Sequence, residues 1–205
     1  MIREWSTGTV ELASGVFARI QSGGGLCIAN AGIITGSATG ATVIDAMFTP
    51  SMTRALLDET RRVAGTSRIE RLVNTHHHVD HTLGNALFPS ETEILAHTRT
   101  KSEMERTGLG PLDIIARIAP HFGDELQSAQ QRLPDGTFDG DALELEIAGR
   151  VVRLLHFGTA HTRGDVLVHL PAERILFAGD AGFFFVTPLA FEGHIGKWAA
   201  VIRRV

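Results

Sequence analysis

Hydrophobic and polar residues alternate near the start of the chain, most clearly over Val16–Ile20, and this is the period of a half-buried β-strand. Glycine-rich pieces at 23–25 and 36–37 interrupt the hydrophobic runs and predict turns. The pattern therefore predicts a series of strands before residue 46. They span Val16–Ile20, Leu26–Asn30, Gly32–Thr35 and Ala41–Asp45.

The next segment has the period of an amphipathic helix. Thr49 suits an N-cap, Pro50 suits the first helical position, and Gly65 is typical of a helix end. Because apolar residues recur three or four positions apart, one face of this helix is expected to be buried. The apolar face carries Met52, Ala55, Leu56 and Val63, opposite Arg54, Asp58, Arg61 and Arg62.

Short strands and a helical stretch are predicted in the middle of the chain. An apolar run at 69–74 indicates a buried strand, and Glu93–Ala96 indicates another that ends at His97, which we interpret as the polar residue that begins a helix. Residues 98–132 are predicted to be helical, with a break at 108–111. An apolar stripe is expected there, formed by Ile114, Ile115, Ile118 and Ala119.

The last third of the chain returns to strands. Leu143–Ile147 alternates cleanly and is predicted to pair with Val151–Phe157 across a tight hairpin turn at 149–150. Two more strands are expected at Val166–Leu170 and Arg174–Phe177. The succession of strands, helix, strand, helices and strands indicates a mixed α and β fold.

Composition narrows the class of protein. The chain has 205 residues, enough to bury a sizeable core, and is most simply one domain, residues 1–205. Hydrophobic residues make up 43% and charged residues 20%, as in soluble globular proteins. The net charge of −4 with scattered basic residues argues against nucleic-acid partners, and no apolar run is long enough for a membrane span. The single cysteine fits a cytoplasmic location.

Candidate chemistry is concentrated in the seven residues Thr75–His81, directly after a predicted buried strand. They contain four histidines and one aspartate, and imidazole and carboxylate ligands together suit zinc. If the strand continues, His76 and His78 point to one side and His77 to the other. An imidazole pair lies beside an Asp-His pair. We therefore interpret this stretch as a site for two neighbouring metal ions, and not as a histidine-rich segment that is only solvated.

Outside this stretch, Asp45 and Cys27 also bear on the candidate site. Asp45 ends its predicted strand, and its carboxylate either orients a ligand histidine or forms an ordinary strand-end turn. Cys27 has no histidine near it in sequence, so we interpret it as a small buried apolar group and not as a nucleophile.

Two later stretches complete a pattern with the histidine motif. They are Gly158–Asp165, which contains His161, and Leu176–Asp180. In order and spacing the three stretches resemble the signature of the metallo-β-lactamase superfamily, with its glyoxalase II-like and β-lactamase-like members. The resemblance covers nearly the whole chain and implies an α+β fold, a four-layer αβ/βα sandwich with its ligands on loops along one edge. Residues 98–132 would then be a helical insertion near the active site.

The resemblance also implies a ligand set and a reaction. Two zinc ions are expected, with iron or manganese as alternatives. A metal-bound hydroxide, oriented by the catalytic residue Asp80, would attack the carbonyl of a small-molecule ester, thioester, lactone or lactam. The implied ligands are His76, His78 and His161 for the first metal and Asp80 and His81 for the second, with Asp180 bridging them.

The C-terminal region departs from the family pattern. Family members usually carry a further ligand histidine after the bridging aspartate, and here only His194 follows Asp180. We interpret His194 and Phe183 as residues that line the substrate pocket. We also expect the natural protein to continue beyond Val205, with the last strand and helix of the fold missing here. An uncovered apolar segment at 183–186 would then favour a homo-oligomer.

Two other functions agree with the same residues. A mononuclear iron dioxygenase that acts on a thiol persulfide shares the histidine motif and the later histidine and aspartate. A catalytically silent metal-binding or interaction domain agrees with the missing last ligand. Bound iron with oxygen consumption would indicate the first alternative, and bound metal without turnover would indicate the second.

Overall fold

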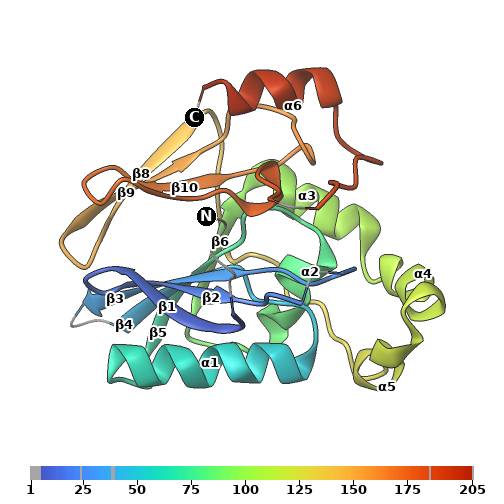
Figure 1. The fold of residues 1–205 in the computed structure, drawn as a ribbon, viewed down its shortest axis with the longest axis horizontal. Helices are drawn as coiled ribbons and strands as arrows, with labels where there is room; N and C mark the ends of the chain where they lie inside the picture. Colours follow the sequence, from blue (N-terminus) through green and yellow to red (C-terminus); the bar gives the residue numbers. More distant parts are fainter. Residues whose placement is uncertain (1–5, 24, 38–39, 185, 205) are drawn as a thin grey trace.

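The computed structural model describes residues 6–23, 25–37, 40–184 and 186–204. Within these residues the strands form two sheets that lie face to face, with helices on both outer sides (Figure 1). One sheet has seven strands in the order β1-β2-β3-β4-β5-β6-β7, and the other has four in the order β11-β10-β9-β8.

The seven-stranded sheet begins antiparallel and ends parallel. Neighbouring strands from β1 to β4 are antiparallel, and those from β4 to β7 are parallel. Parallel strands need long crossover connections, and these carry the helices next to the sheet. The strands are β1 (Gly8–Ala13), β2 (Val16–Ile20), β3 (Ala31–Ser37), β4 (Gly40–Ile44), β5 (Ile69–Val73), β6 (Glu93–His97) and β7 (Gly136–Phe138).

The four-stranded sheet is antiparallel throughout. Its hairpin pairs Ile147 with Arg150, and the two turn residues, Ala148 and Gly149, have φ values of 54° and 74°. Two left-handed residues in succession are the favoured geometry of a two-residue hairpin. The predicted hairpin is confirmed, but its turn lies at 148–149, one position before the predicted 149–150, and Arg150 is already in the strand. The strands are β8 (Ala142–Ile147), β9 (Arg150–Leu155), β10 (Leu167–Leu170) and β11 (Ile175–Phe177).

Two helices enclose the paired sheets, α1 (Pro50–Ala64) below and α6 (Ile195–Ile202) above in Figure 1. Aliphatic side chains from both sheets fill the space between them, with Ile34 and Leu154 in one continuous cluster. A second cluster joins α1 to the seven-stranded sheet, and a third joins Trp198 of α6 to the four-stranded sheet. The order helix, sheet, sheet, helix confirms the predicted α+β four-layer sandwich.

The predicted boundaries of α1 are confirmed by its capping contacts. The Thr49 hydroxyl accepts a hydrogen bond from the Met52 amide at 3.3 Å, and Pro50 is the first helical residue. Gly65 follows the helix with φ 64°, and its amide donates to the Arg61 carbonyl at 3.0 Å. A left-handed glycine at this position is a common way for a helix to end.

The other helices of the described chain lie between strands or between the last strand and α6. In the part of the chain that the structure describes, no helix is long and apolar enough to cross a membrane. The remaining helices are α2 (Val79–Thr82), η1 (Leu83–Leu87), α3 (Thr98–Thr107), α4 (Pro111–Ile118), η2 (Pro120–Phe122), α5 (Gly123–Leu126) and η3 (Gly179–Ala181).

Some predictions for the first sheet were wrong. Leu26–Asn30 is not a strand, and Cys27 has φ 60°, which an extended strand cannot contain. The first strand, β1, was not predicted from the sequence. Ser37 still belongs to β3, so no turn lies at 36–37. The residues that follow it, 38–39, and the middle of the predicted turn at 23–25 lie outside the described residues.

The segment 98–132 is helical only as far as Leu126, and its predicted apolar stripe was wrong in part. Ile115 and Ala119 are buried, but Ile114 and Ile118 are 63% and 64% exposed. The buried face of α4 carries Leu112 and Ile115 and continues to Ala119 just after the helix, three and seven positions after Leu112. This helical spacing turns the two other isoleucines toward solvent.

His97 joins β6 to α3, and its predicted role at a helix start is confirmed. Its Nδ1 accepts a hydrogen bond from the Arg99 amide at 3.1 Å. The ring is buried and stacks on His156 with 4.0 Å between ring centroids. Burial, together with the positive charge that His156 can carry, lowers the pKa of His97 from 6.5 to about 4.

We expect the stability of the protein to fall as the pH drops from 6.5 to 4, with His97 as one cause. Between these values the unfolded chain binds a proton at this imidazole and the folded chain does not. The contribution of His97 is therefore complete above pH 6.5, falls as the pH drops from 6.5 to 4 and is fully lost below about pH 4. His97→Asn can still cap α3 but cannot titrate, so its urea-unfolding free energy should fall less steeply with acidification. Equal pH slopes for both proteins would contradict this.

Gly84 in η1 packs directly against the segment after β4 and against α1. A Cβ atom at this position would collide with the Ala46 carbonyl oxygen and the Thr53 hydroxyl. Gly84→Ala should therefore lower the free energy of unfolding by about 1–3 kcal/mol in urea titrations. Gly123→Ala is the matched control, because a Cβ there meets nothing within 4 Å and should leave stability unchanged or slightly higher. Equal stabilities of the two variants would contradict the close packing.

Candidate metal centre

Five side chains from the three sequence motifs meet on the loops that follow β5, β9 and β11. His78 Nδ1 lies 3.0 Å from His161 Nε2. Asp180 Oδ1 lies 3.1 Å from His81 Nε2, and its Oδ2 lies 3.5 Å from His161 Nε2. Among these five side chains, candidate ligand atoms within 4.8 Å of one another form two groups that share a residue. The groups are His76, His78 and His161, and His76, His81 and Asp180.

Asp45 supports the first of these loops from behind. Its carboxylate accepts hydrogen bonds from the Thr75 amide at 2.8 Å and hydroxyl at 2.7 Å, and from His81 Nδ1 at 2.8 Å. The side chain is buried, and its backbone has φ 62°, a left-handed conformation that costs a non-glycine residue about 1–3 kcal/mol. These contacts support the interpretation of Asp45 as the residue that orients a ligand histidine.

The same hydrogen bonds determine which ring nitrogens face the centre. The Thr75 hydroxyl donates to Asp45 and therefore accepts from Nδ1–H of His76, at 3.1 Å. When both rings are neutral, Nε2 of His76 and of His81 then carries the lone pair. His76 Nε2 is buried and has no hydrogen-bond partner among the described residues. Because a buried acceptor without a partner is costly, this donor set fits a metal ion.

The two central rings have opposite electrostatic environments. Burial lowers the pKa of His76 well below its ordinary value, and the neighbouring histidines lower it further. Burial also lowers the pKa of His81, but three carboxylates, with Asp45 the strongest, outweigh it and raise that pKa well above its ordinary value. His76 is therefore ready to bind a metal ion as a neutral ring, whereas His81 must release a proton first.

Asp165 fixes the loop that carries His161. Its buried carboxylate accepts hydrogen bonds from the Ala160 amide at 3.2 Å, the Thr162 amide at 2.8 Å and the Thr162 hydroxyl at 2.6 Å. The His161 ring lies edge-on to Trp198 of α6, with 5.3 Å between centroids. The ring is thus positioned by its own loop and by the outer helix layer.

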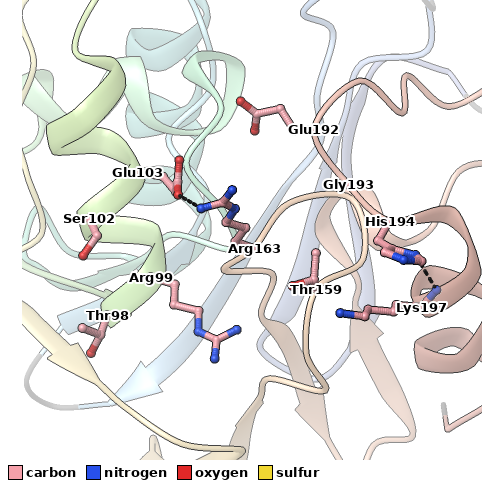
Figure 2. A pocket seen from close by; sticks show the side chains of 10 residues that line it. All are labelled: Thr98, Arg99, Ser102, Glu103, Thr159, Arg163, Glu192, Gly193, His194 and Lys197. Carbon is pink, nitrogen blue, oxygen red and sulfur yellow. Dashed lines mark hydrogen bonds and ion pairs between the residues drawn. The ribbon is translucent and has the colours of Figure 1, made fainter.

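The other predicted site residues lie outside the two ligand groups. The Asp80 carboxylate is 3.9 Å from His81 Nε2, and the Phe183 ring is 5.8 Å from the His161 ring. His194 caps α6, with its Nδ1 accepting from the Lys197 amide at 3.3 Å. It lines a groove of about 550 Å³ between α3 and the segment before α6 (Figure 2). Roles for these residues stay predictions.

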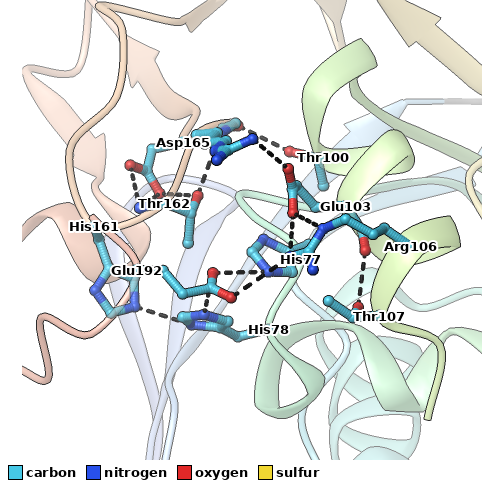
Figure 3. A network of polar contacts seen from close by, with 12 residues as sticks. His77, His78, Thr100, Glu103, Arg106, Thr107, His161, Thr162, Asp165 and Glu192 are labelled. Carbon is cyan, nitrogen blue, oxygen red and sulfur yellow. Dashed lines mark hydrogen bonds and ion pairs between the residues drawn. The ribbon is translucent and has the colours of Figure 1, made fainter. Parts of the chain in front are cut away.

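Sequence reasoning missed Glu192. Its Oε2 lies 3.0 Å from His77 Nε2 and 3.2 Å from His78 Nε2 (Figure 3). Hydrogen bonds from these two rings hold the pKa of Glu192 well below its ordinary value. Residues 76–78 have left β5, so they do not alternate as in a strand, and His77 meets the same carboxylate as its neighbour. Glu192 is 114 positions from His78, and no local pattern indicates it.

The fold and this donor set define the class of protein. Residues 24–204 match the model of the metallo-β-lactamase superfamily, and the chain belongs to that superfamily. The family resemblance inferred from the three motifs is thereby confirmed. The superfamily is one of metal-dependent hydrolases, and the histidine and aspartate groups described above are compatible with metal binding.

Two curated relatives are similar over about three-quarters of the chain. The 2,4-dinitroanisole O-demethylase subunit alpha of Nocardioides sp. (strain JS1661) is 27% identical over 147 residues, 71% of this chain and 39% of the relative. The hydroxyacylglutathione hydrolase of Synechococcus sp. (strain JA-3-3Ab) is 28% identical over 153 residues, 74% of this chain and 49% of the relative. The chain thus spans less than half the length of either relative.

Solved structures show the same fold. The DIM-1 metallo-β-lactamase exposed to ceftazidime has a TM-score of 0.72 at 19% identity, covering 98% of this chain and 84% of that chain. The metallo-β-lactamase from Pontibacter korlensis has a TM-score of 0.71 at 20% identity, covering 96% and 83%. At these identities the likeness establishes the architecture and leaves the substrate open.

Asp45→Asn should lower the free energy of unfolding of the metal-free protein by about 3 kcal/mol, because it removes the buried charge that faces His81. Urea unfolding in the presence of a chelator measures this. Asp58→Asn is the control, since that carboxylate is 75% exposed in a surface pair with Arg61 and should matter by less than about 1 kcal/mol. If the two variants were equally stable, Asp45 would not support the loop.

Proposed function

We propose that this chain is a metal-dependent hydrolase that cleaves the carbonyl group of an ester, thioester, lactone or lactam. The observation that carries the proposal is the pair of ligand groups, which share His76 and together contain the five predicted ligands other than Asp80. The hydroxyacylglutathione hydrolase among the relatives supports a hydrolytic reaction. The substrate is proposed to be a small molecule, without nucleic-acid or membrane partners.

The donor set suits two zinc ions, because imidazole and carboxylate ligands of this number are typical of zinc hydrolases. When bound, the metals supply Lewis acidity and lower the pKa of a coordinated water. His76, His78 and His161 would hold the first ion, and Asp80 and His81 the second. Asp180 would contribute to both, a role supported by its two oxygens, one near His81 Nε2 and the other near His161 Nε2.

The residues of the chain itself contribute orientation and proton handling. Asp80 has a partly exposed carboxylate beside His81, and we assign it the role of orienting the attacking water. Cys27 does not compete as a nucleophile, because burial and the charge of Asp80 raise the pKa of its thiol to about 12. Water is therefore the attacking group in this proposal.

We further propose a cytoplasmic location and a homo-oligomeric state. Cys27, the only cysteine, is buried as a free thiol, which supports a reducing compartment. Phe184 and Phe191, in the segment before α6, are 78% and 71% exposed. Exposed aromatic side chains close together in sequence support self-association.

Metal content and turnover test the proposed function together. Protein purified without chelator is expected to hold about two zinc ions per chain by elemental analysis and to hydrolyse members of an ester and thioester panel. His161→Ala should bind at least one ion fewer and show only the uncatalysed rate, because that ring faces both His78 and Asp180. His121→Ala, at an exposed ring on η2, is the control and should match the parent protein.

Two results would contradict this function. Bound iron with oxygen consumption on a persulfide substrate would indicate the dioxygenase. Full zinc occupancy without turnover on any acyl substrate would indicate a silent metal-binding domain.

A further inference from the structure

We infer that Glu192 is a positioning residue of the metal centre. Its carboxylate accepts a hydrogen bond from Nε2 of His78, so that Nδ1 of that ring faces the ligand group that His78 forms with His76 and His161. The inference rests on the proposed function, because it assigns His78 to the first metal. Glu192 lies in the loop between η3 and α6, outside the three motifs that carry the candidate ligands.

The geometry assigns the two nitrogens of His78 to different partners. Nδ1 lies 3.0 Å from His161 Nε2, within the first ligand group. Nε2 lies 3.2 Å from Glu192 Oε2, on the other side of the ring. A carboxylate can only accept, so Nε2 carries the proton, and the lone pair of a neutral ring is left on Nδ1. Carboxylates behind ligand histidines fix ring orientation and increase ligand basicity in this way.

Glu192 is held in place by contacts of the residues on either side. The amide of His194 donates to the Ala160 carbonyl at 2.9 Å, and a Cβ at Gly193 would collide with that carbonyl and with the one of His161. Phe191 stacks on the His78 ring with 5.5 Å between centroids. Residues 191–194 therefore contact the loops of both His78 and His161, which come from different sheets.

A charged network fixes the carboxylate from the side of α3 (Figure 3). Glu192 Oε2 also lies 3.0 Å from His77 Nε2, and its Oε1 lies 3.9 Å from Arg106. Arg106 pairs with the buried Glu103 at 2.6 Å, and Arg163 approaches Glu103 at 3.5 Å. Because Arg106 lies on α3 and Arg163 on the loop of His161, the network connects the Glu192 carboxylate to both segments.

His77, His78 and Glu192 also satisfy the spacing of a metal-binding group. A direct ligand role for Glu192 is therefore the competing interpretation. The two roles predict different results. A ligand changes how many ions are bound at saturation, whereas a positioning residue changes affinity at unchanged stoichiometry.

The experiment measures zinc affinity by chelator competition, together with stoichiometry at saturation, for the full chain. Glu192→Gln keeps the size of the side chain but removes its charge, and zinc should bind about 10-fold to 100-fold more weakly with unchanged stoichiometry. Glu105→Gln on the exposed side of α3 is the matched control and should bind zinc like the parent protein.

A double-mutant cycle separates positioning from a general structural role. If Glu192 acts through His78, Glu192→Gln should change zinc affinity by less than about 2-fold in a His78→Ala background. Equal losses in both backgrounds would overturn the inference, as would parent-like affinity of Glu192→Gln or the loss of an ion at saturation. Failure of the parent protein to bind zinc would instead overturn the proposed function, so the two failures are distinguishable.

Discussion

The buried carboxylate of Asp45 is the contact on which the candidate metal centre depends. It accepts hydrogen bonds from the amide and hydroxyl of Thr75 and from the ring of His81, and so it determines the conformation of the loop after β5. An uncompensated charge at such a position would be very unfavourable. The three donors, one of them the His81 ring, compensate this charge. The same contacts orient the His76 and His81 rings so that the lone pairs of their Nε2 atoms point toward one ligand group.

The centre is divided between the two sheets, so its geometry requires that the sheets keep their relative position. The aliphatic core between them provides this constraint, because a close-packed interior tolerates little displacement. One backbone hydrogen bond connects the two halves directly at the site, from the Val166 amide to the Thr75 carbonyl at 2.8 Å. The ligand loops are therefore attached to each other as well as to their own sheets.

Carboxylates outside the ligand groups do much of the orienting. Asp45 lies behind His81, Asp165 organises the loop of His161, and Glu192 lies behind His78. Each accepts hydrogen bonds that select one conformation or one tautomer of a histidine. This arrangement agrees with membership of a superfamily of metal-dependent hydrolases. In such enzymes the protein contributes chiefly ligand geometry and control of protons.

The sequence by itself determined the mixed α and β class and the caps of α1, because these depend on local strand and helix periods and on a threonine, a proline and a glycine at the helix ends. The spacing of the three motifs indicated the family, and the four-layer sandwich followed from that resemblance. Only the tertiary structure decided that Leu26–Asn30 is irregular, that Ile114 and Ile118 face solvent, and that Glu192 meets His78. Asp45 needed both kinds of information. Its place in the sequence allowed either a strand-end turn or the orientation of a ligand histidine, and its hydrogen bonds to Thr75 and His81 supported the second role. The physical reason is that burial and long-range hydrogen bonds depend on which distant segments pack together. Local residue patterns do not indicate which segments those are.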